Sequence, residues 1–136
     1  MVRLAETVKR VVNIVPLNRT SAGAVKGSGV ARGDFNRVCA YCPVGVLGSG
    51  AKADFKLQES DTDVDGNYAD ISGAAAVQVA EATPNVCPDI DVRLFKKYVR
   101  AVHTVTATTG VNAGVVLLFY DGGDQPVVNT PASVIV

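Results

Sequence analysis

The chain has 136 residues, which is the size of one ordinary domain and too short for two. Hydrophobic residues make up 48% of it and charged residues 19%, and it contains no tryptophan. Much of the apolar content is valine and alanine. Because the branched side chain of valine suits pleated surfaces better than helices, this composition favours β structure and argues against a helical bundle.

The net charge is zero, but the charges are unevenly distributed along the chain. Residues 1–52 carry eight basic and two acidic side chains, whereas residues 53–91 carry one basic and nine acidic side chains. The basic first part is predicted to meet an acidic surface, such as that of an identical subunit; ordinary solvated charges are the alternative. The basic residues are not interleaved with aromatic residues, so no nucleic-acid partner is expected.

No targeting or membrane segment is expected. Arg3, Glu6 and Lys9 interrupt the apolar residues at the start, so the sequence does not predict a signal peptide. The apolar run Gly114–Tyr120 is too short to span a bilayer. We therefore expect a product without a membrane partner.

The first third predicts little regular structure. Leu4–Val15 is expected to form an extended arm that Pro16 ends. Asn18–Gly33 is rich in glycine, alanine and serine, which predicts a mobile loop. Residues 1–33 are accordingly predicted to be a basic flexible arm and loop, and residues 34–136 a single β domain with a C-terminal tail.

The middle of the chain predicts strands. Val38–Leu47 reads as a strand that Pro43 interrupts. Phe55–Ser60 alternates apolar and polar residues and opens a hairpin, for which Asp65-Gly66 predicts a tight turn with positive backbone angles. The return strand is expected around Ala75–Ala80.

The last third contains the clearest strands. Thr83–Asp91 holds two prolines and predicts a crossover loop, and Lys97–Ala107 then alternates cleanly, with His103 on its apolar face. Val115–Tyr120 is a continuous apolar run, typical of a central strand buried on both faces. Gln125–Val136 predicts an extended tail. About seven or eight short strands at roughly ten-residue spacing predict an all-β sandwich or barrel.

Asp61, Asp63 and Asp65, followed by Gly66, copy the first half of a calcium-binding loop, with oxygen ligands on alternate residues. A helix-flanked calcium loop has a glutamate at its twelfth position, where this chain has Ser72. We therefore interpret the segment as an acidic, solvated hairpin tip and predict no metal site. A partial calcium site is the alternative.

The three cysteines, Cys39, Cys42 and Cys87, are too few and odd in number for a disulfide scaffold, so free thiols are expected. Cys39 and Cys42 have a spacing used in zinc and redox motifs, but residues three apart on a strand point to opposite faces. A metal site joining the thiols to His103 is the alternative. His103 is interpreted as a core or interface residue, and without a mutually supporting catalytic set we predict neither an enzyme nor a cofactor.

Four segments resemble a known family: Lys56–Asp61, Asp65-Gly66, Tyr68–Asp70 and Lys97–Ala101. Together they look like small structural proteins encoded in tailed-bacteriophage head gene clusters, in particular the capsid decoration, or cement, proteins of short-tailed phages. The resemblance covers roughly residues 53–120. It implies a β-sandwich of jelly-roll type, often dimeric or trimeric, clamped across neighbouring major capsid subunits. It assigns no functional residue.

The hypothesis is therefore a non-enzymatic β-sandwich of jelly-roll type with extended N- and C-terminal arms. It would bind the exterior of the icosahedral phage head after synthesis in the host cytoplasm and stabilise the shell of major capsid protein, with a homodimer favoured. Charge complementarity and strand addition to a neighbour's sheet predict the contact residues. They are Arg3, Lys9, Arg10 and Arg19 in the basic arm and Val134, Ile135 and Val136 in the tail.

Two other classes stay open at this point. The first is a carbohydrate-binding or adhesion module of a virion fibre or tail protein, which would use the acidic hairpin tip or an exposed Tyr68. The second is a small metal-dependent regulator that would use Cys39 and Cys42.

Overall fold

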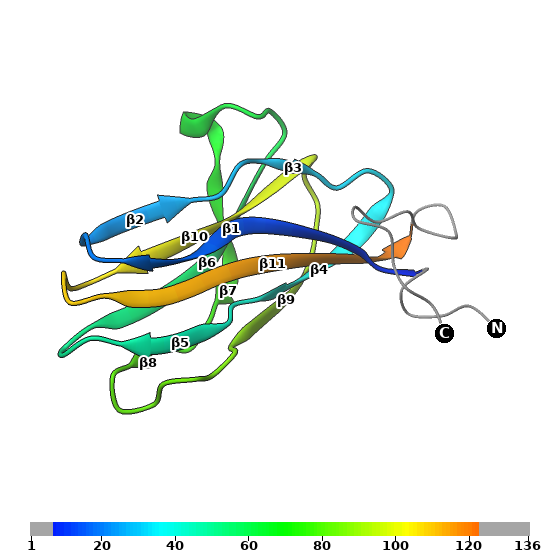
Figure 1. Cartoon of the computed structure of the whole chain (residues 1–136). Coiled ribbons are helices and arrows are strands. Elements are labelled where there is room, and N and C mark those ends of the chain that lie inside the picture. Colours follow the sequence, from blue (N-terminus) through cyan, green and yellow to red (C-terminus); the bar gives the residue numbers. More distant parts are fainter. Residues whose placement is uncertain (1–6, 123–136) are drawn as a thin grey trace.

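The computed structural model describes residues 7–122, which form two antiparallel sheets stacked on one another (Figure 1). The strands are β1 (Lys9–Arg19), β2 (Gly23–Lys26), β3 (Val30–Ala31), β4 (Phe35–Tyr41), β5 (Val44–Leu47), β6 (Lys52–Ser60), β7 (Ala69–Ala75), β8 (Val79–Ala80), β9 (Asp89–Arg93), β10 (Tyr98–Val105) and β11 (Val111–Gly122). The first sheet has five strands in the order β1-β11-β4-β9, with β5 also paired to β11. The second has six in the order β2-β10-β6-β7, with β3 paired to β10 and β8 to β6.

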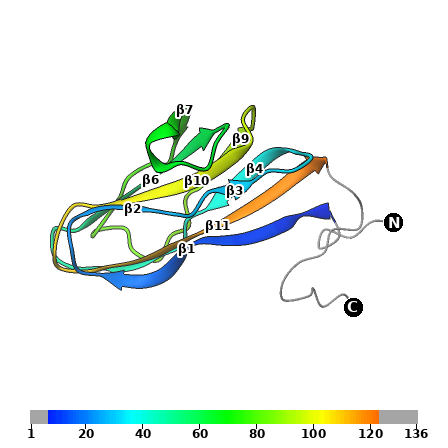
Figure 2. The same ribbon diagram turned by 90° about the horizontal axis from the view of Figure 1, so that it is seen from above.

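The chain passes repeatedly from one sheet to the other, which is the topology of a jelly roll. It runs from β1 in the first sheet to β2 and β3 in the second, returns through β4 and β5, crosses to β6–β8, and ends with β9, β10 and β11 in alternate sheets. The view from above in Figure 2 shows the two layers. The predicted all-β sandwich of jelly-roll type is confirmed. Among residues 7–122, no helix has the length and apolar character needed to cross a bilayer.

The core lies between the two layers and is built from the inward residues of the central strands. On β10, Val99, His103 and Val105 are buried on the inner face, as predicted, but Arg100 and Val102 on the opposite face are buried as well. On β11, Leu117 and Phe119 are 0% and 1% exposed. Apolar side chains at every second position of both strands therefore join the two sheets.

The predicted flexible arm is wrong for the described part of residues 1–33. β1 pairs with β11 over its whole length, and its Ile14 is 2% exposed in the core. β2 and β3 pair with β10 in the second sheet. These segments look irregular in sequence, but pairing with a strong neighbouring strand satisfies their backbone groups. The predicted C-terminal tail lies outside the described residues.

Pro16 does not end the first element, because β1 absorbs it in a bulge. The register of β1 against β11 shifts between Val12 and Ile14 and again between Ile14 and Leu17. Pro16 lies against Gly114, where an added Cβ would stand 2.8 Å from the proline Cγ. A glycine at this position of β11 lets the proline approach the sheet, so the strand continues to Arg19.

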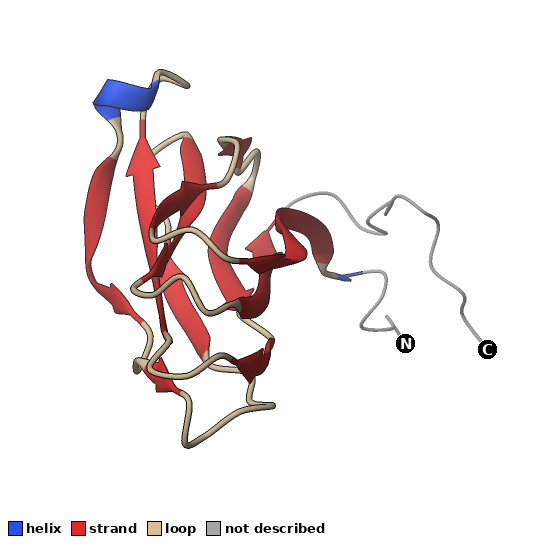
Figure 3. Ribbon diagram, turned by 60° about the vertical axis from the view of Figure 1, so that its left-hand side comes forward, coloured by secondary structure: helices blue, strands red, loops and turns tan. Residues whose placement is uncertain are grey.

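The predicted hairpin forms, but its return strand β7 spans Ala69–Ala75, earlier than the expected Ala75–Ala80, and its turn also differs from the expected one. Glu59 pairs with Ala69, and the tip is a 3₁₀ turn over Asp65–Asn67, the blue turn at the top of Figure 3. Gly66 does not adopt a positive φ. The connection is longer than a two-residue loop, so the right-handed turn fits without the special backbone angles that an Asp-Gly pair permits.

Two predictions in the last third need correction. The expected crossover loop up to Asp91 gives way at Asp89 to β9, which pairs with β4 and so forms an edge of the first sheet. β11 is central, as predicted, but only one of its faces is buried within the described residues. Val116, Leu118 and Tyr120 on the other face are half-buried, and this open face is the most distinctive surface of the molecule.

Candidate functional site

The outward surface of the first sheet carries apolar side chains where a solvated sheet would carry polar ones. The antiparallel register places Val12 on β1, Val116 on β11 and Tyr41 on β4 side by side, with Asp89 on β9 at the end of the row. Val12 is 57% and Tyr41 42% exposed. This row therefore presents apolar contact area to whatever lies above the sheet.

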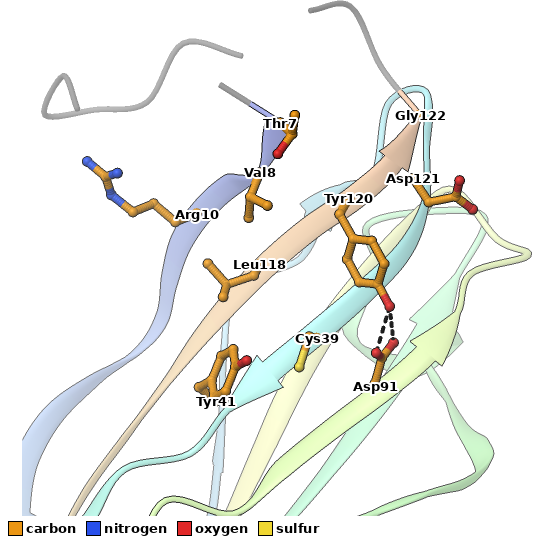
Figure 4. Close-up of a pocket in the computed structure, with 10 residues that line it drawn as sticks. All are labelled: Thr7, Val8, Arg10, Cys39, Tyr41, Asp91, Leu118, Tyr120, Asp121 and Gly122. Carbon is orange, nitrogen blue, oxygen red and sulfur yellow. Dashed lines mark hydrogen bonds between the residues drawn. The ribbon is translucent and has the colours of Figure 1, made fainter. Parts of the chain in front are cut away.

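A second row lies next to the first and crosses the same four strands. It consists of Arg10, Leu118, Cys39 and Asp91, in the order β1, β11, β4, β9. Figure 4 shows these side chains around a hollow of about 730 Å³, together with Tyr120 at the end of β11. We call the surface formed by the two rows the outer face. It is apolar in the middle, basic on the β1 side and acidic on the β9 side.

The polar groups at the rim of the hollow bind one another. The Tyr120 hydroxyl lies 2.6 Å from both carboxylate oxygens of Asp91, as Figure 4 shows. Arg37 donates from Nε to the Tyr120 hydroxyl at 2.9 Å and from Nη2 to Asp91 at 3.1 Å. Burial, together with the hydrogen bond to Asp91, raises the pKa of Tyr120. The hydroxyl thus stays protonated at neutral pH, and this rim offers contact surface more than reactive groups.

The outward surface of the second sheet has the opposite character. Lys56 donates to Asp70 at 2.9 Å, and Gln58 donates to the same carboxylate at 2.8 Å. Gln78 donates to both carboxylate oxygens of Asp54 at 2.9 Å. Its polar side chains therefore have partners within the chain and suit contact with water.

Arg100 ties the hairpin loop to this second surface. Its side chain is 6% exposed, and it donates to Asp65 at 2.6 Å and to Gln58 at 2.9 Å. The guanidinium carbon lies 4.0 Å from the centroid of the Tyr68 ring, and Lys26 pairs with Asp65 at 3.1 Å. Hydrogen bonds from Arg100 first and Lys26 second lower the pKa of Asp65. The charge of Asp65 is thus balanced by two cations of the same chain.

The three aspartates of the partial calcium loop have different partners. Asp65 is held by two cations, and Asp63 accepts a hydrogen bond from the Tyr68 hydroxyl at 2.7 Å. Asp61 is exposed. Within residues 7–122 no group of three or more His, Cys, Asp or Glu side chains is placed to hold a metal ion. The proposed sugar ligand Tyr68 also has its ring covered by Arg100.

The structure does not bring the three cysteines and His103 together. Cys39 lies on the outer face, Cys42 and His103 are fully buried in the core, and Cys87 is exposed. All three thiols are free, as predicted. Burial raises the pKa of Cys42 to about 12 and raises that of Cys39 as well. These two thiols are therefore protonated at neutral pH and are poor nucleophiles and metal ligands.

The predicted capsid-contact residues have different surroundings. Lys9 is exposed at the start of β1, and Arg10 belongs to the outer face. Arg19 instead donates to the carbonyls of Ala113 at 2.8 Å and Val15 at 2.9 Å, and burial lowers its pKa. Arg19 thus has a structural contact across the β1 bulge. Arg3 in the arm, and Val134, Ile135 and Val136 in the tail, lie outside the described residues.

His103 is a core residue with an incomplete set of hydrogen bonds. Its ring stacks on Phe55 with centroids 4.6 Å apart, and Nδ1 donates to the carbonyl of Asp54 at 3.3 Å. Nε2 has no partner among the described residues. Burial is the main cause that lowers the pKa of this imidazole. The interpretation as a core histidine is confirmed.

Neutral His103 is expected to make folding stability depend on pH. Because the pKa is lower in the folded than in the unfolded chain, this contribution is fully present above pH about 6.5 and is lost as the pH falls through the folded-state pKa. One proton changes the free energy of unfolding by at most about 1.4 kcal/mol per pH unit. Urea denaturation between pH 7.5 and pH 5 should show this loss in the wild type and a smaller one in His103→Phe. Parallel curves would contradict it.

Comparison with known proteins shows the fold. No family model and no curated protein matches the chain. The PBSX exported protein XepA is similar over all of this chain, with a TM-score of 0.59 and 18% identity, and the chain spans 44% of that protein. The infectious bursal disease virus Gx strain protein and the VP2 subviral particle of that virus give TM-scores of 0.54 and 0.52 at 9% and 8% identity. Each match covers 88% of this chain and about a third of the viral protein, 33% and 34%. The chain is thus a jelly-roll β-sandwich that spans less than half the length of these proteins.

Proposed function

We propose that this chain is a structural protein of a phage particle that binds the outer surface of the icosahedral head and stabilises the major capsid protein shell. The observation that carries the proposal is a jelly-roll sandwich in which residues 7–122 leave the apolar outward surface of one sheet partly exposed. A large exposed apolar patch on a folded domain is typical of a protein interface.

The comparisons support the viral setting of the proposal. XepA is phage-derived, and the VP2 structure is that of a subviral particle, so the same fold occurs in proteins of both settings. A fold hosts many functions, so the role of this chain has to be inferred from its own surfaces. The described part of the molecule offers a docking surface and internally paired charges, which suits a subunit that lends contact area and needs neither cofactor nor catalysis.

The stabilising mechanism is mass action. A subunit that binds the mature shell better than the broken one raises the stability of the shell by its differential affinity, and many copies add their contributions. Lys9, exposed at the start of β1, supplies charge complementarity towards an acidic shell surface. Deleting residues 1–19 to test this arm would remove β1 and its core residue Ile14, so a point substitution is the cleaner change.

Particle association is the decisive experiment. Purified heads should contain the chain in a fixed, saturable copy number by quantitative mass spectrometry, and heads lacking it should break at a lower temperature until the recombinant protein is added. Lys9→Glu should lower occupancy, whereas Lys52→Glu, an exposed lysine at the start of β6, should not. Absence from purified heads, together with binding on a glycan array, would favour an adhesion module instead.

A further inference from the structure

We propose that the loop between β9 and β10 binds single-stranded nucleic acid, with a base stacked on Phe95 and phosphates held by the cations around it. The loop joins β9 in the first sheet to β10 in the second (Figure 1). We call Arg93, Phe95, Lys96 and Lys97 the basic loop. It lies beyond the two rows of the outer face, so the inference goes beyond the proposed function and does not depend on it.

The basic loop holds an aromatic ring in an exposed position. Phe95 is 72% exposed, whereas its neighbour Leu94 is 3% exposed and anchors the loop in the core. Glu59 accepts hydrogen bonds from the backbone N–H groups of Phe95 and Lys96, both at 3.3 Å. Arg32 donates from Nε to the carbonyl of Lys96 at 2.8 Å. Because these contacts already order the loop, a ligand that covers the ring pays little for ordering it.

The cations of the basic loop have no carboxylate partner among residues 7–122. The ion pairs between these described residues involve Lys26, Arg37, Lys56 and Arg100. The Arg93 guanidinium carbon instead lies 5.6 Å from the centroid of the Phe95 ring. Lys97 Nζ lies 5.5 Å from the centroid of the Tyr98 ring. Aromatic rings with unneutralised cations beside them are suited to a ligand that is both flat and anionic.

A pair of like charges next to the loop also favours an anion. The register of β4 and β9 places Arg37 directly opposite Arg93. The Cβ atoms of such partners lie about 5 Å apart, where like charges destabilise a sheet. Asp91 pairs with Arg37 at 3.1 Å and also accepts a hydrogen bond from the Tyr120 hydroxyl. A phosphate beside Arg93 would supply the second negative charge and offset the repulsion.

Single-stranded nucleic acid matches the basic loop better than two other anionic partners. A membrane would have to take up Phe95 together with the guanidinium 5.6 Å from its ring, and a charge is costly in hydrocarbon. A protruding ring that anchors a protein interface needs a pocket in the partner as well as acidic residues around it. A single strand offers a flat base for the ring and a phosphate at every nucleotide.

The sequence-based expectation of no nucleic-acid partner rests on the basic first part, residues 1–52. The basic loop lies outside that part and combines cations and aromatic rings within residues 93–98. Three cations at three phosphates predict a slope of about −2 for the logarithm of the association constant against the logarithm of the salt concentration. So few contacts predict a Kd on the order of 10⁻⁴ M at physiological salt and tighter binding at low salt.

Stacking on Phe95 is tested by fluorescence anisotropy. The full chain, titrated at low salt into a labelled oligothymidylate of about 15 nucleotides, should raise the anisotropy to saturation. Phe95→Ala should weaken binding at least about fivefold, because the stacking surface is lost. Val77→Ala, at a loop valine that is 85% exposed, should bind like the wild type. An abasic oligonucleotide of the same length should bind the wild type and Phe95→Ala equally, since it has phosphates but no base to stack.

The phosphate contacts are tested by neutralising single cations. Arg93→Gln and Lys97→Gln should each weaken binding and reduce the salt slope by about 0.7. Lys52→Gln, which removes an exposed lysine at the start of β6, should leave the slope unchanged. Circular dichroism confirms that the variants are folded. A wild-type slope in Arg93→Gln would contradict the assigned phosphate contact.

Two results would overturn the proposal as a whole. The first is an anisotropy that does not change at low salt with protein at about 10⁻⁴ M. The second is equally tight binding to anionic phospholipid vesicles or to polyglutamate with the same loss in Phe95→Ala, which would assign the loop to a membrane or to an acidic protein surface. Neither measurement uses phage heads, so failure of nucleic-acid binding and failure of the proposed function are separate outcomes.

Discussion

Replacing Leu117 by alanine is expected to lower the free energy of unfolding by about 2–5 kcal/mol, whereas the same change at Leu118 should lower it by about 1 kcal/mol or less. The two leucines are neighbours on β11 and point to opposite faces of the sheet. Leu117 is 0% exposed between the sheets, and its truncation leaves a cavity. Leu118 lies half-buried on the outer face, where solvent fills the space.

The measurement is urea denaturation followed by circular dichroism. Equal losses of folding stability would mean that the folded monomer already buries both sides of β11, contrary to the open outer face.

Asn13→Ala is expected to lower the free energy of unfolding by about 1–3 kcal/mol. The Asn13 side chain accepts a hydrogen bond from the backbone N–H of Ala101 on β10 and donates one to the carbonyl of Ser28, both at 2.7 Å. These groups lie where β10 passes the gap between β2 and β3. Alanine would leave the buried Ala101 N–H unsatisfied, and its exchange with deuterium should accelerate.

Gly27→Ala provides the matched perturbation of the same contact. A Cβ on Gly27 would overlap the Asn13 side chain, so the amide must move away from Ala101. Combined in one chain, Gly27→Ala and Asn13→Ala should lower stability by less than the sum of the two separate losses, because the smaller side chain removes the overlap. Asn36→Ala, which removes an exposed hydrogen bond to the Asp121 carbonyl, should have little effect. Additive losses would show that the two residues act through separate contacts.

Strands with a clear local pattern could be predicted from the sequence. The alternation of Lys97–Ala107 identified β10 and its inner face, including the buried His103. Pro43 marked the interruption between β4 and β5. In both cases neighbouring residues along the chain carry the information, because the period of two and the missing proline N–H are properties of a single strand.

Strands with weak patterns were missed, and with them part of the candidate site. β2, β3 and β9 are short and lie in segments that read as loops. They form because β10 and β4 offer them backbone partners from far along the chain. The sequence therefore did not predict that Asp89 and Asp91 lie on the same sheet surface as Arg10, at the opposite edge of the sheet. The continuous apolar run of β11 did indicate that both faces of this strand are apolar. The pattern predicts burial on both faces, whereas within residues 7–122 the outer face is only half-buried.

The sequence by itself determined the class of the protein: valine-rich alternation and about seven or eight short strands at roughly ten-residue spacing predict a β-sandwich. Only the tertiary structure decided which sheet surface of the described residues stays apolar and partly exposed. It also decided that Asp65 is bound by Arg100 and Lys26, whereas Asp89 and Asp91 lie on the outer face. The physical reason is that side-chain alternation is encoded locally, whereas strand neighbours and register depend on contacts between residues far apart in the chain.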